Sequence, residues 1–261
     1  MKQDLQRNED GSIYNSIGLG YARTRREDPK LYDRIQAALG NSQSVVNIGA
    51  GTGSYEPKNL CVLAVEPSEV MASQRGPDAA PVIQAKADKL PLHDKSFDAA
   101  MTVFSIHHWH PHLREGIAEM VRVSRKRIVI VTYDTRVSNN MWLLSDYFPE
   151  TAKLDSQIFP YPETICSWLN KSAQVQIVPN DRNTPDWTIG SFWAHPERVL
   201  DPVARAATSG FSRQSADFIQ RVASNVEHDL KSGEWDRKYG YLRKLDEFDV
   251  GLRIITAECA R

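Results

Sequence analysis

The stretch Ser44-Val-Val-Asn-Ile-Gly-Ala-Gly-Thr-Gly53 decides the fold, because a short apolar segment runs directly into three closely spaced glycines. The apolar residues predict a buried strand, and the glycines, which lack a Cβ, allow a tight turn and close approach of a ligand. A plain turn would not need three glycines in five residues. We therefore predict a ligand-binding loop at the end of this strand.

Apolar segments alternate with helical patterns on both sides of this loop. A helix is predicted from Asp28 and Pro29 to Gly40, a second is capped by Ser68, and a third covers Leu113–Val123. Strands are predicted at residues 44–48, 60–65, 82–85, 97–106, 127–133, 174–178 and 252–257. Strands that alternate with helices need crossover connections. We therefore predict an α/β, Rossmann-like fold with a seven-stranded, mostly parallel sheet and helices on both faces.

The chain divides into four predicted parts. Residues 1–27 are expected to form a lid segment, 28–178 the core, 179–247 a helical insertion that forms a cap, and 248–261 the last core strand. The insertion is rich in aromatic residues, which suits a cover over an apolar or planar small molecule from which water is excluded. The same rings could instead form the core of the insertion itself.

Composition narrows the class of protein. Hydrophobic residues make up 41% and charged residues 25%, and 32 Lys and Arg balance 33 Asp and Glu. This excludes a disordered chain and a basic nucleic-acid surface over the whole protein. Cys61, Cys166 and Cys259 lie too far apart for a disulfide framework or a metal knuckle. Residues 1–10 lack the apolar segment of a secretion signal and no apolar run could span a membrane, so we expect a soluble, cytoplasmic protein.

An acidic residue follows the second predicted strand. Glu66 stands where a carboxylate could accept hydrogen bonds from both hydroxyls of a ribose. The dinucleotide fingerprint G-x-G-x-x-G would need its third glycine at Ser54, so the match to that fingerprint is incomplete. The pattern predicts a nucleoside ligand and weakens the case for a dinucleotide.

Four motifs together resemble a known family. They stand at 45–53, 65–68, 87–92 and 96–98, in order and at normal spacing, and they are similar to those of class I S-adenosylmethionine-dependent methyltransferases. The nearest branch is the small-molecule one that includes quinone-ring methyltransferases. The resemblance implies S-adenosylmethionine as the cofactor and methyl transfer to the O, N or C atom of a small organic acceptor.

The same resemblance assigns cofactor contacts. The glycine loop would lie under the methionine part, Glu66 would hold the ribose, and Asp88 would accept from the adenine amino group. Asn47 stands where the family usually has an acid, which would weaken a contact to the ammonium group. The predicted cofactor-binding residues are Tyr21, Arg25, Asn47, Gly49, Ala50, Gly51, Gly53, Glu66, Pro67, Ala87, Asp88 and Ser105.

The segment Ser105-Ile-His-His-Trp109 ends the fourth predicted strand, where an acceptor would approach. Methyl transfer is a displacement that needs positioning more than a base. His108, and after it His107, are the candidate catalytic bases, and both rings could equally serve packing. Trp109 and Trp193 are the further candidates for the acceptor pocket. The nearby histidines do not complete a metal site, so no metal is predicted.

Two other functions stay open at this point. The chain could be an NAD(P)-dependent oxidoreductase, or a methyltransferase-fold protein that binds without catalysis. A nucleic-acid acceptor is not expected, because residues 105–108 lack the paired prolines of nucleic-acid amino methyltransferases. The expected partner is a small-molecule acceptor, with no membrane and no nucleic acid.

Overall fold

The computed structural model describes residues 26–169, 172–206, 208–212 and 214–259. Its main sheet has seven strands in the order β3-β2-β1-β4-β5-β9-β6, in which β9 runs antiparallel to both of its neighbours and the other pairs are parallel. The predicted fold class is therefore confirmed. The strands are β1 (Ser44–Ile48), β2 (Cys61–Val65), β3 (Val82–Ile83), β4 (Phe97–Val103), β5 (Ser124–Tyr133), β6 (Gln174–Ile177) and β9 (Leu252–Glu258).

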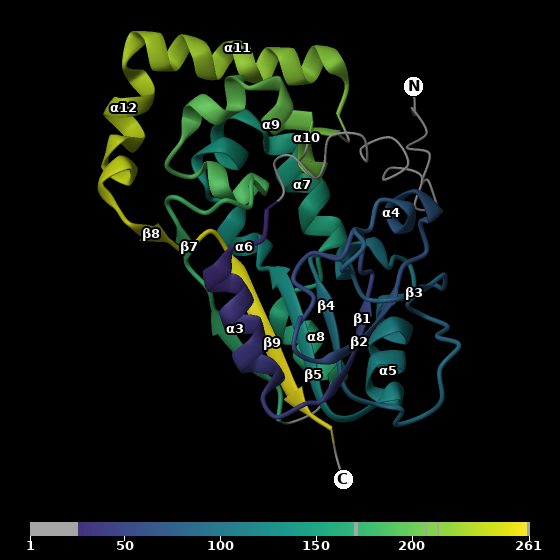
Figure 1. Cartoon of the computed structure of the whole chain (residues 1–261). Helices are drawn as coiled ribbons and strands as arrows, with labels where there is room; N and C mark the ends of the chain where they lie inside the picture. The colour runs from purple at the N-terminus through teal and green to yellow at the C-terminus, as the bar shows by residue number, and fades with distance from the viewer. Residues whose placement is uncertain (1–25, 170–171, 207, 213, 260–261) are drawn as a thin grey trace.

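Both faces of the sheet are covered. Along β5, Val129 and Val131 face one hydrophobic cluster while Ile128 and Ile130 face the other, as the two-residue period of a strand requires. Figure 1 shows α3 (Pro29–Leu39) lying along β9 on the first face. The second face is covered by α5 (Leu113–Val123) and α8 (Pro162–Leu169). Because helices cover both faces of the sheet, the central residues of its strands are apolar on both sides.

A helical layer stands beyond the carboxyl ends of the strands (Figure 1). It is built from two segments, one after β5 and one between β7 (Asn180–Asp181) and β8 (Glu247–Phe248), which pair antiparallel at its base. The prediction of a cap from 179–247 alone did not include the first segment. The elements are α6 (Thr135–Ser138), η2 (Leu143–Tyr147), α7 (Pro149–Ile158), η3 (Ile189–Phe192), η4 (Pro196–Leu200), α9 (Pro202–Ala206), α10 (Ser209–Ser212), α11 (Ala216–Ser232), α12 (Glu234–Tyr239) and η5 (Gly240–Lys244).

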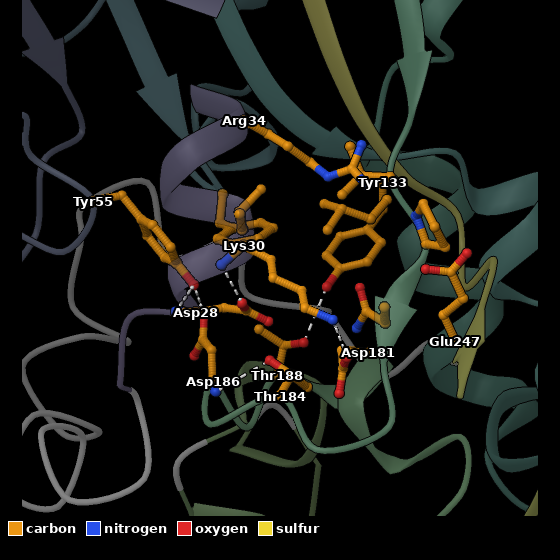
Figure 2. Close-up of a pocket in the computed structure, with 16 residues that line it drawn as sticks. Asp28, Lys30, Arg34, Tyr55, Tyr133, Asp181, Thr184, Asp186, Thr188 and Glu247 are labelled. Carbon is orange, nitrogen blue, oxygen red and sulfur yellow. Dashed lines mark hydrogen bonds and ion pairs between the residues drawn. The ribbon is translucent and has the colours of Figure 1, made fainter. Parts of the chain in front are cut away.

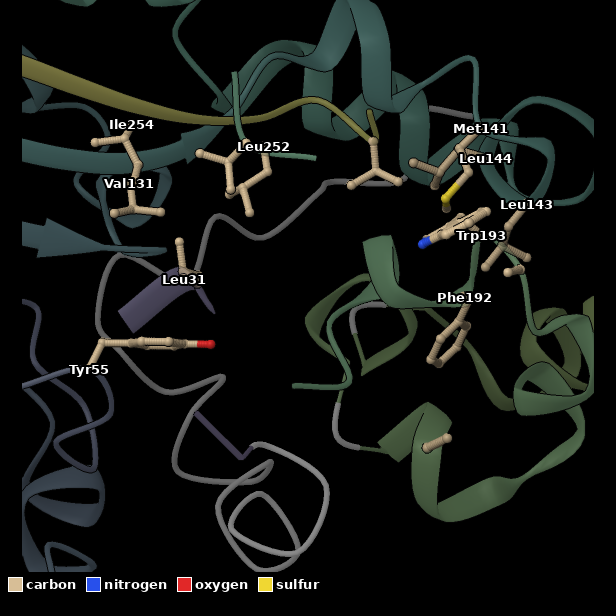
Figure 3. Close-up of a cluster of buried hydrophobic side chains, with 14 of the residues drawn as sticks. Leu31, Tyr55, Val131, Met141, Leu143, Leu144, Phe192, Trp193, Leu252 and Ile254 are labelled. Atoms are coloured by element: carbon tan, nitrogen blue, oxygen red, sulfur yellow. The ribbon is translucent and has the colours of Figure 1, made fainter. Parts of the chain in front are cut away.

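Buried tryptophans join the two segments of this layer. Trp142, from the first segment, donates its indole N–H to the carbonyl oxygen of Trp193 at 3.0 Å and meets Trp235 edge to face, with ring centroids 5.4 Å apart. All three side chains are fully buried. In Figure 3 the cluster extends from Val131 and Leu252 of the sheet to Phe192 and Trp193 of the layer. The layer and the sheet therefore share one hydrophobic core.

The connection from β1 to β2 departs from the expected strand-to-helix loop. The described residues 49–60 form turns and contain no helix. Tyr55 has a left-handed backbone, with φ of 64°, and Pro57 follows it, so helical geometry is interrupted at two neighbouring positions. The next helix is α4 (Glu69–Ser73), which Ser68 caps as predicted by accepting from the amide of Met71. The glycine loop therefore lacks the support of a helix directly after it.

A buried ion pair supports the glycine loop instead. Arg75 and Glu56 have side chains only 4% and 8% exposed, and one guanidinium nitrogen lies 2.7 Å from each carboxylate oxygen. Arg75 also donates to the carbonyl oxygens of Gly51, at 3.0 Å, and Ala80, at 2.9 Å. The carboxylate of Glu56 accepts from the amide of Ala80 in return. This pair fixes the loop to the segment that leads into β3.

Removing one partner of this pair leaves a buried charge without compensation. We expect Arg75→Met to lower the free energy of unfolding by about 3–5 kcal/mol, as breaking a buried pair does. The matched control is Lys231→Met, since Lys231 pairs with Glu227 on the exposed face of α11, where a pair contributes about 0–1 kcal/mol. Urea denaturation followed by circular dichroism measures both losses. Equal losses in the two variants would contradict the role given to Arg75.

Candidate functional site

A cavity of about 310 Å³ lies at the carboxyl ends of β1, β2, β3 and β4. Open parallel sheets bind ligands at this edge. We call it the glycine-loop cavity, because residues 49–52 form one side of it. The sequence-predicted site residues that line it are Gly49, Ala50, Gly51, Glu66, Pro67, Ala87, Asp88, Ser105, His108 and Trp109.

Glu66 is placed at this cavity by the glycine loop itself. One carboxylate oxygen accepts from the amide of Gly51 at 2.7 Å, and the other accepts from the amide of Ser68 at 2.9 Å. Burial raises the pKa of Glu66 above its usual 4.5, although the two amide hydrogen bonds and the charge of Arg75 oppose this shift. A carboxylate has about four acceptor positions. Glu66 therefore keeps capacity for donors from a ligand while it fixes the loop.

The loop after β3 carries the second predicted acid. Ala87 and Asp88 line the cavity, and the next turn is tied to α5 by Arg122, which donates to the carbonyl oxygens of Leu90 and Leu92. Glu119 accepts from the amide of Leu90 at 2.7 Å. Arg122 lies in the last turn of α5. The structure gives it a specific task, which is to hold the Asp88 segment at the cavity.

Ser105 packs directly against the glycine loop. A Cβ on Gly49, whose φ is 69°, would lie 1.8 Å from the hydroxyl oxygen of Ser105, so only glycine fits there. The same hydroxyl accepts from the indole N–H of Trp109 at 3.2 Å. Trp109 in turn lies against Gly116 of α5, where a Cβ would come within 2.5 Å of its ring. The end of β4 and the glycine loop are thereby fitted to each other.

A second cavity, of about 80 Å³, lies between the sheet and the helical layer. We call it the aromatic cavity, since Phe104, Tyr133 and Phe159 line it together with His107 and Asp155. The ring of His107 stacks on Phe159 with centroids 4.0 Å apart, and Phe104 stacks on Tyr133 at 5.6 Å. Further lining residues are Thr135, Ser138, Met141, Leu144, Thr188, Ile189, Gly190, Thr208, Gly210 and Val250.

The two candidate histidines lie at different cavities. His108 lines the glycine-loop cavity and His107 lines the aromatic cavity, and their ring centroids are 3.8 Å apart. Both stand on η1 (Ile106–His108), a short 3-10 helix. The predicted strand 97–106 was too long, because the chain leaves the sheet after Val103 and Phe104 takes a left-handed backbone. This early exit places the two imidazoles at the boundary of the cavities.

Some predicted residues lie elsewhere. Asn47 is buried beneath the loop, where its amide nitrogen donates to Glu56 at 3.3 Å, so it does not line the glycine-loop cavity. Gly53 packs against Glu56 and Arg75 and is also absent from the lining. Trp193 is fully buried and stacks on Phe248, outside the lining of both cavities, because the helical layer needs it for its own core. Tyr21 and Arg25 lie outside the described residues.

Other lining residues were missed. Tyr55 and Met71 line the glycine-loop cavity, and Tyr133, Asp155 and Phe159 line the aromatic one. Met71 follows the Glu66 motif closely enough for helical spacing to have suggested it. The three residues of the aromatic cavity come from the end of β5 and from α7 and the turn after it. No local pattern marks them.

Neither a metal-binding cluster nor a membrane-spanning helix is found in the described part of the chain. No three of its His, Cys, Asp or Glu side chains gather in a way that could hold a metal ion. Nor does any helix there have the length and apolar character needed to cross a bilayer.

Comparison with known proteins gives the family. The family described as "Methyltransferase domain" matches residues 46–131. A putative methyltransferase from an antibiotic biosynthesis pathway of Anabaena variabilis ATCC 29413 is 31% identical, with a TM-score of 0.82, and the match covers 90% of this chain and 98% of that one. No curated protein matches the chain significantly.

More distant structures share the fold alone. A possible histamine N-methyltransferase of Thermotoga maritima is 16% identical, with a TM-score of 0.52 and coverage of 95% of this chain and 93% of that one. Phosphoethanolamine N-methyltransferase 2 of Haemonchus contortus, solved in complex with S-adenosyl-L-methionine, is 16% identical, with a TM-score of 0.55 and coverage of 96% of this chain and 56% of that one.

The family match spans the glycine loop, Glu66 and the strands from β1 to β5, and the match to the Anabaena structure covers 90% of this chain. The chain therefore belongs to the class I S-adenosylmethionine-dependent methyltransferases, and S-adenosylmethionine is its cofactor.

Proposed function

We propose that the protein transfers a methyl group from S-adenosylmethionine in the glycine-loop cavity to a small organic acceptor in the aromatic cavity. The observation that carries this proposal is that Phe104 lines both cavities, so that the two meet at the end of β4. Stacked rings suit a planar or apolar acceptor. The relative from Anabaena, described as part of an antibiotic biosynthesis pathway, supports a small-molecule acceptor.

The residues of the glycine-loop cavity fit the cofactor chemically. Glu66 offers carboxylate oxygens for ribose hydroxyls, and Asp88 offers an acceptor for an adenine amino group. Met71, Pro67 and Ala87 give apolar surface beside these acids, which suits a purine ring. Thr52 and Ser54 also line the cavity and add hydroxyl groups that can donate or accept. A nucleoside with a charged amino acid chain matches this donor and acceptor set.

The bound cofactor supplies an electrophilic methyl group on a sulfonium. The contribution of the protein is to hold the acceptor in line and to keep water out, which can supply about 7–11 kcal/mol of the barrier reduction. Phe104, Tyr133 and Phe159 form the apolar walls that exclude water. An imidazole can take up a proton near neutral pH, so His108 is proposed to remove the acceptor's proton and His107 to orient the acceptor ring.

Family membership favours this activity over the two alternatives. A nicotinamide oxidoreductase would bind a pyrophosphate, but Ser54 stands where the dinucleotide fingerprint has its third glycine, and the described residues 49–60 contain no helix to receive one. A purely binding role rested on Asn47 alone. Asn47 is buried beneath the loop, where its amide nitrogen donates to Glu56, and it does not line the glycine-loop cavity, so its lack of charge is no sign of lost cofactor binding there.

The acceptor can be identified by labelling. The protein is incubated with S-adenosylmethionine carrying a labelled methyl group and with a small-molecule metabolite extract, and the labelled product is identified by mass spectrometry. We expect label in one small organic compound. Label confined to macromolecules added in parallel, or a saturable micromolar affinity for a nicotinamide dinucleotide, would contradict the proposal.

Glu66 is expected to control cofactor affinity. Glu66→Ala should weaken S-adenosylmethionine binding at least about tenfold in calorimetry, since hydrogen bonds to a charged acceptor contribute about 1.5–3 kcal/mol each. The exposed acid Glu69 at the start of α4 offers the matched control, Glu69→Ala. Unchanged affinity in the Glu66 variant would remove this residue from the site.

The pH dependence of S-adenosylmethionine binding should also show the role of Glu66. Because burial raises the pKa of Glu66, its carboxylate takes up a proton at a higher pH than a free glutamate with a pKa of 4.5. Affinity should therefore be constant near neutral pH and fall as the pH decreases through this raised pKa. Glu66→Gln should bind more weakly and lose this acidic fall, and a parallel fall in that variant would assign the effect to another group.

His108 is tested once the acceptor is known. We expect His108→Ala to lower turnover by about 10²–10⁴-fold, the range that a general base contributes, with cofactor affinity retained. Formation of S-adenosylhomocysteine measures the turnover. His93→Ala, on an exposed loop away from both cavities, serves as the control. Full turnover in the His108 variant would leave its ring a packing role only.

A further inference from the structure

Phe104 has a backbone conformation that large side chains rarely adopt. Its φ is 54°, in the left-handed region, and the only other non-glycine residues of the described chain with positive φ are Tyr55 and Lys95. Glycine occupies this region without steric cost, whereas a Cβ is crowded there. A strained backbone at a bulky residue is a reason to ask what its side chain does.

The ring of Phe104 is clamped between two anchored tyrosines. It stacks on Tyr133, with centroids 5.6 Å apart and planes 22° apart, and meets Tyr55 edge to face at 6.2 Å. The hydroxyl of Tyr55 donates to Asp186 at 2.8 Å, and that of Tyr133 lies 3.0 Å from the hydroxyl of Thr188 (Figure 2). Both anchors belong to the segment before η3 of the helical layer. The position of the ring is therefore fixed from two sides.

Phe104 lines three cavities at once. They are the glycine-loop cavity, the aromatic cavity, and a third of about 30 Å³ beside the start of α3, shown in Figure 2. The boundary between the first two also passes between His107 and His108, each of which lines one of them. Any group that moves from one cavity to the other must pass this ring or these imidazoles.

We propose that Phe104 is a specificity-determining residue that limits the transferable group on the sulfonium to the size of a methyl. This inference rests on the proposed function, which requires the transferable group to lie at the boundary of the two cavities. A ring that is stacked on Tyr133 and in edge contact with Tyr55 resists moving aside for a larger group, because a shift would disrupt both contacts. The strained backbone is retained since a glycine at this position would leave the boundary open.

The test measures binding, so that it needs no acceptor. Calorimetry compares S-adenosylmethionine with its analogue that carries a benzyl group on sulfur in place of the methyl. We expect the wild-type protein to prefer the methyl compound by at least about tenfold, since closed pockets reject one extra methylene by about 10–200-fold. Phe104→Gly should bring the two affinities within about threefold of each other, the tenfold preference being lost.

Lys95→Gly is the matched control. Lys95 has nearly the same backbone, with φ of 52°, but it is exposed and precedes β4 at the opposite end of the strand. This variant removes the same kind of strain without opening the boundary, and it should keep the wild-type preference. Phe104→Ala is a second variant that removes the ring and opens the boundary but keeps the Cβ. Thermal melting shows whether each variant is folded.

The outcomes separate the two proposals. Absence of S-adenosylmethionine binding in the wild-type protein would overturn the proposed function. Normal binding with an unchanged preference in folded Phe104→Gly and Phe104→Ala would overturn the role of Phe104 alone. A wild-type protein that binds both compounds equally would overturn it as well.

Discussion

The buried pair of Arg75 and Glu56 is the interaction on which the site depends. The described residues 49–60 contain no helix directly after the glycine loop, so the loop cannot be held by the first turn of one. The guanidinium of Arg75 reaches the carbonyl oxygen of Gly51, whose amide is bound on its other side by Glu66. One glycine is thus fixed from both of its polar groups. Loop, acid and cation form a single unit that a change at any member would disturb.

The glycine-loop cavity was predictable because its signals are local. Glycines, Glu66 and Asp88 each follow a strand within a few residues, and parallel strands bring their carboxyl ends to one edge. The spacing of apolar residues predicted the first and last residues of β1 and of α5 correctly. Residues 104–106 were wrongly predicted as strand, since an apolar run does not reveal the left-handed backbone at Phe104.

The aromatic cavity could not be predicted in the same way. Its walls come from Tyr133, from Asp155 and Phe159 near the end of α7, and from the segment around η3, which are distant in sequence. Trp193 looked like a pocket residue by type, yet its ring is fully buried and stacks on Phe248, and its carbonyl oxygen accepts from Trp142. Aromatic composition shows that rings are present. Only the tertiary structure shows which rings face a cavity and which face one another.

The two-part construction of the helical layer has a consequence for how such proteins diversify. The longer part leaves and re-enters the sheet region through the short pairing of β7 with β8, which makes it a natural unit for exchange between homologous enzymes. Trp142, however, binds this unit from the other segment. In a chimaera that receives only the longer part, the contacts of Trp142 with Trp193 and Trp235 would no longer match. Exchange of the helical layer therefore requires both segments to be transplanted together, while the glycine loop can stay as it is.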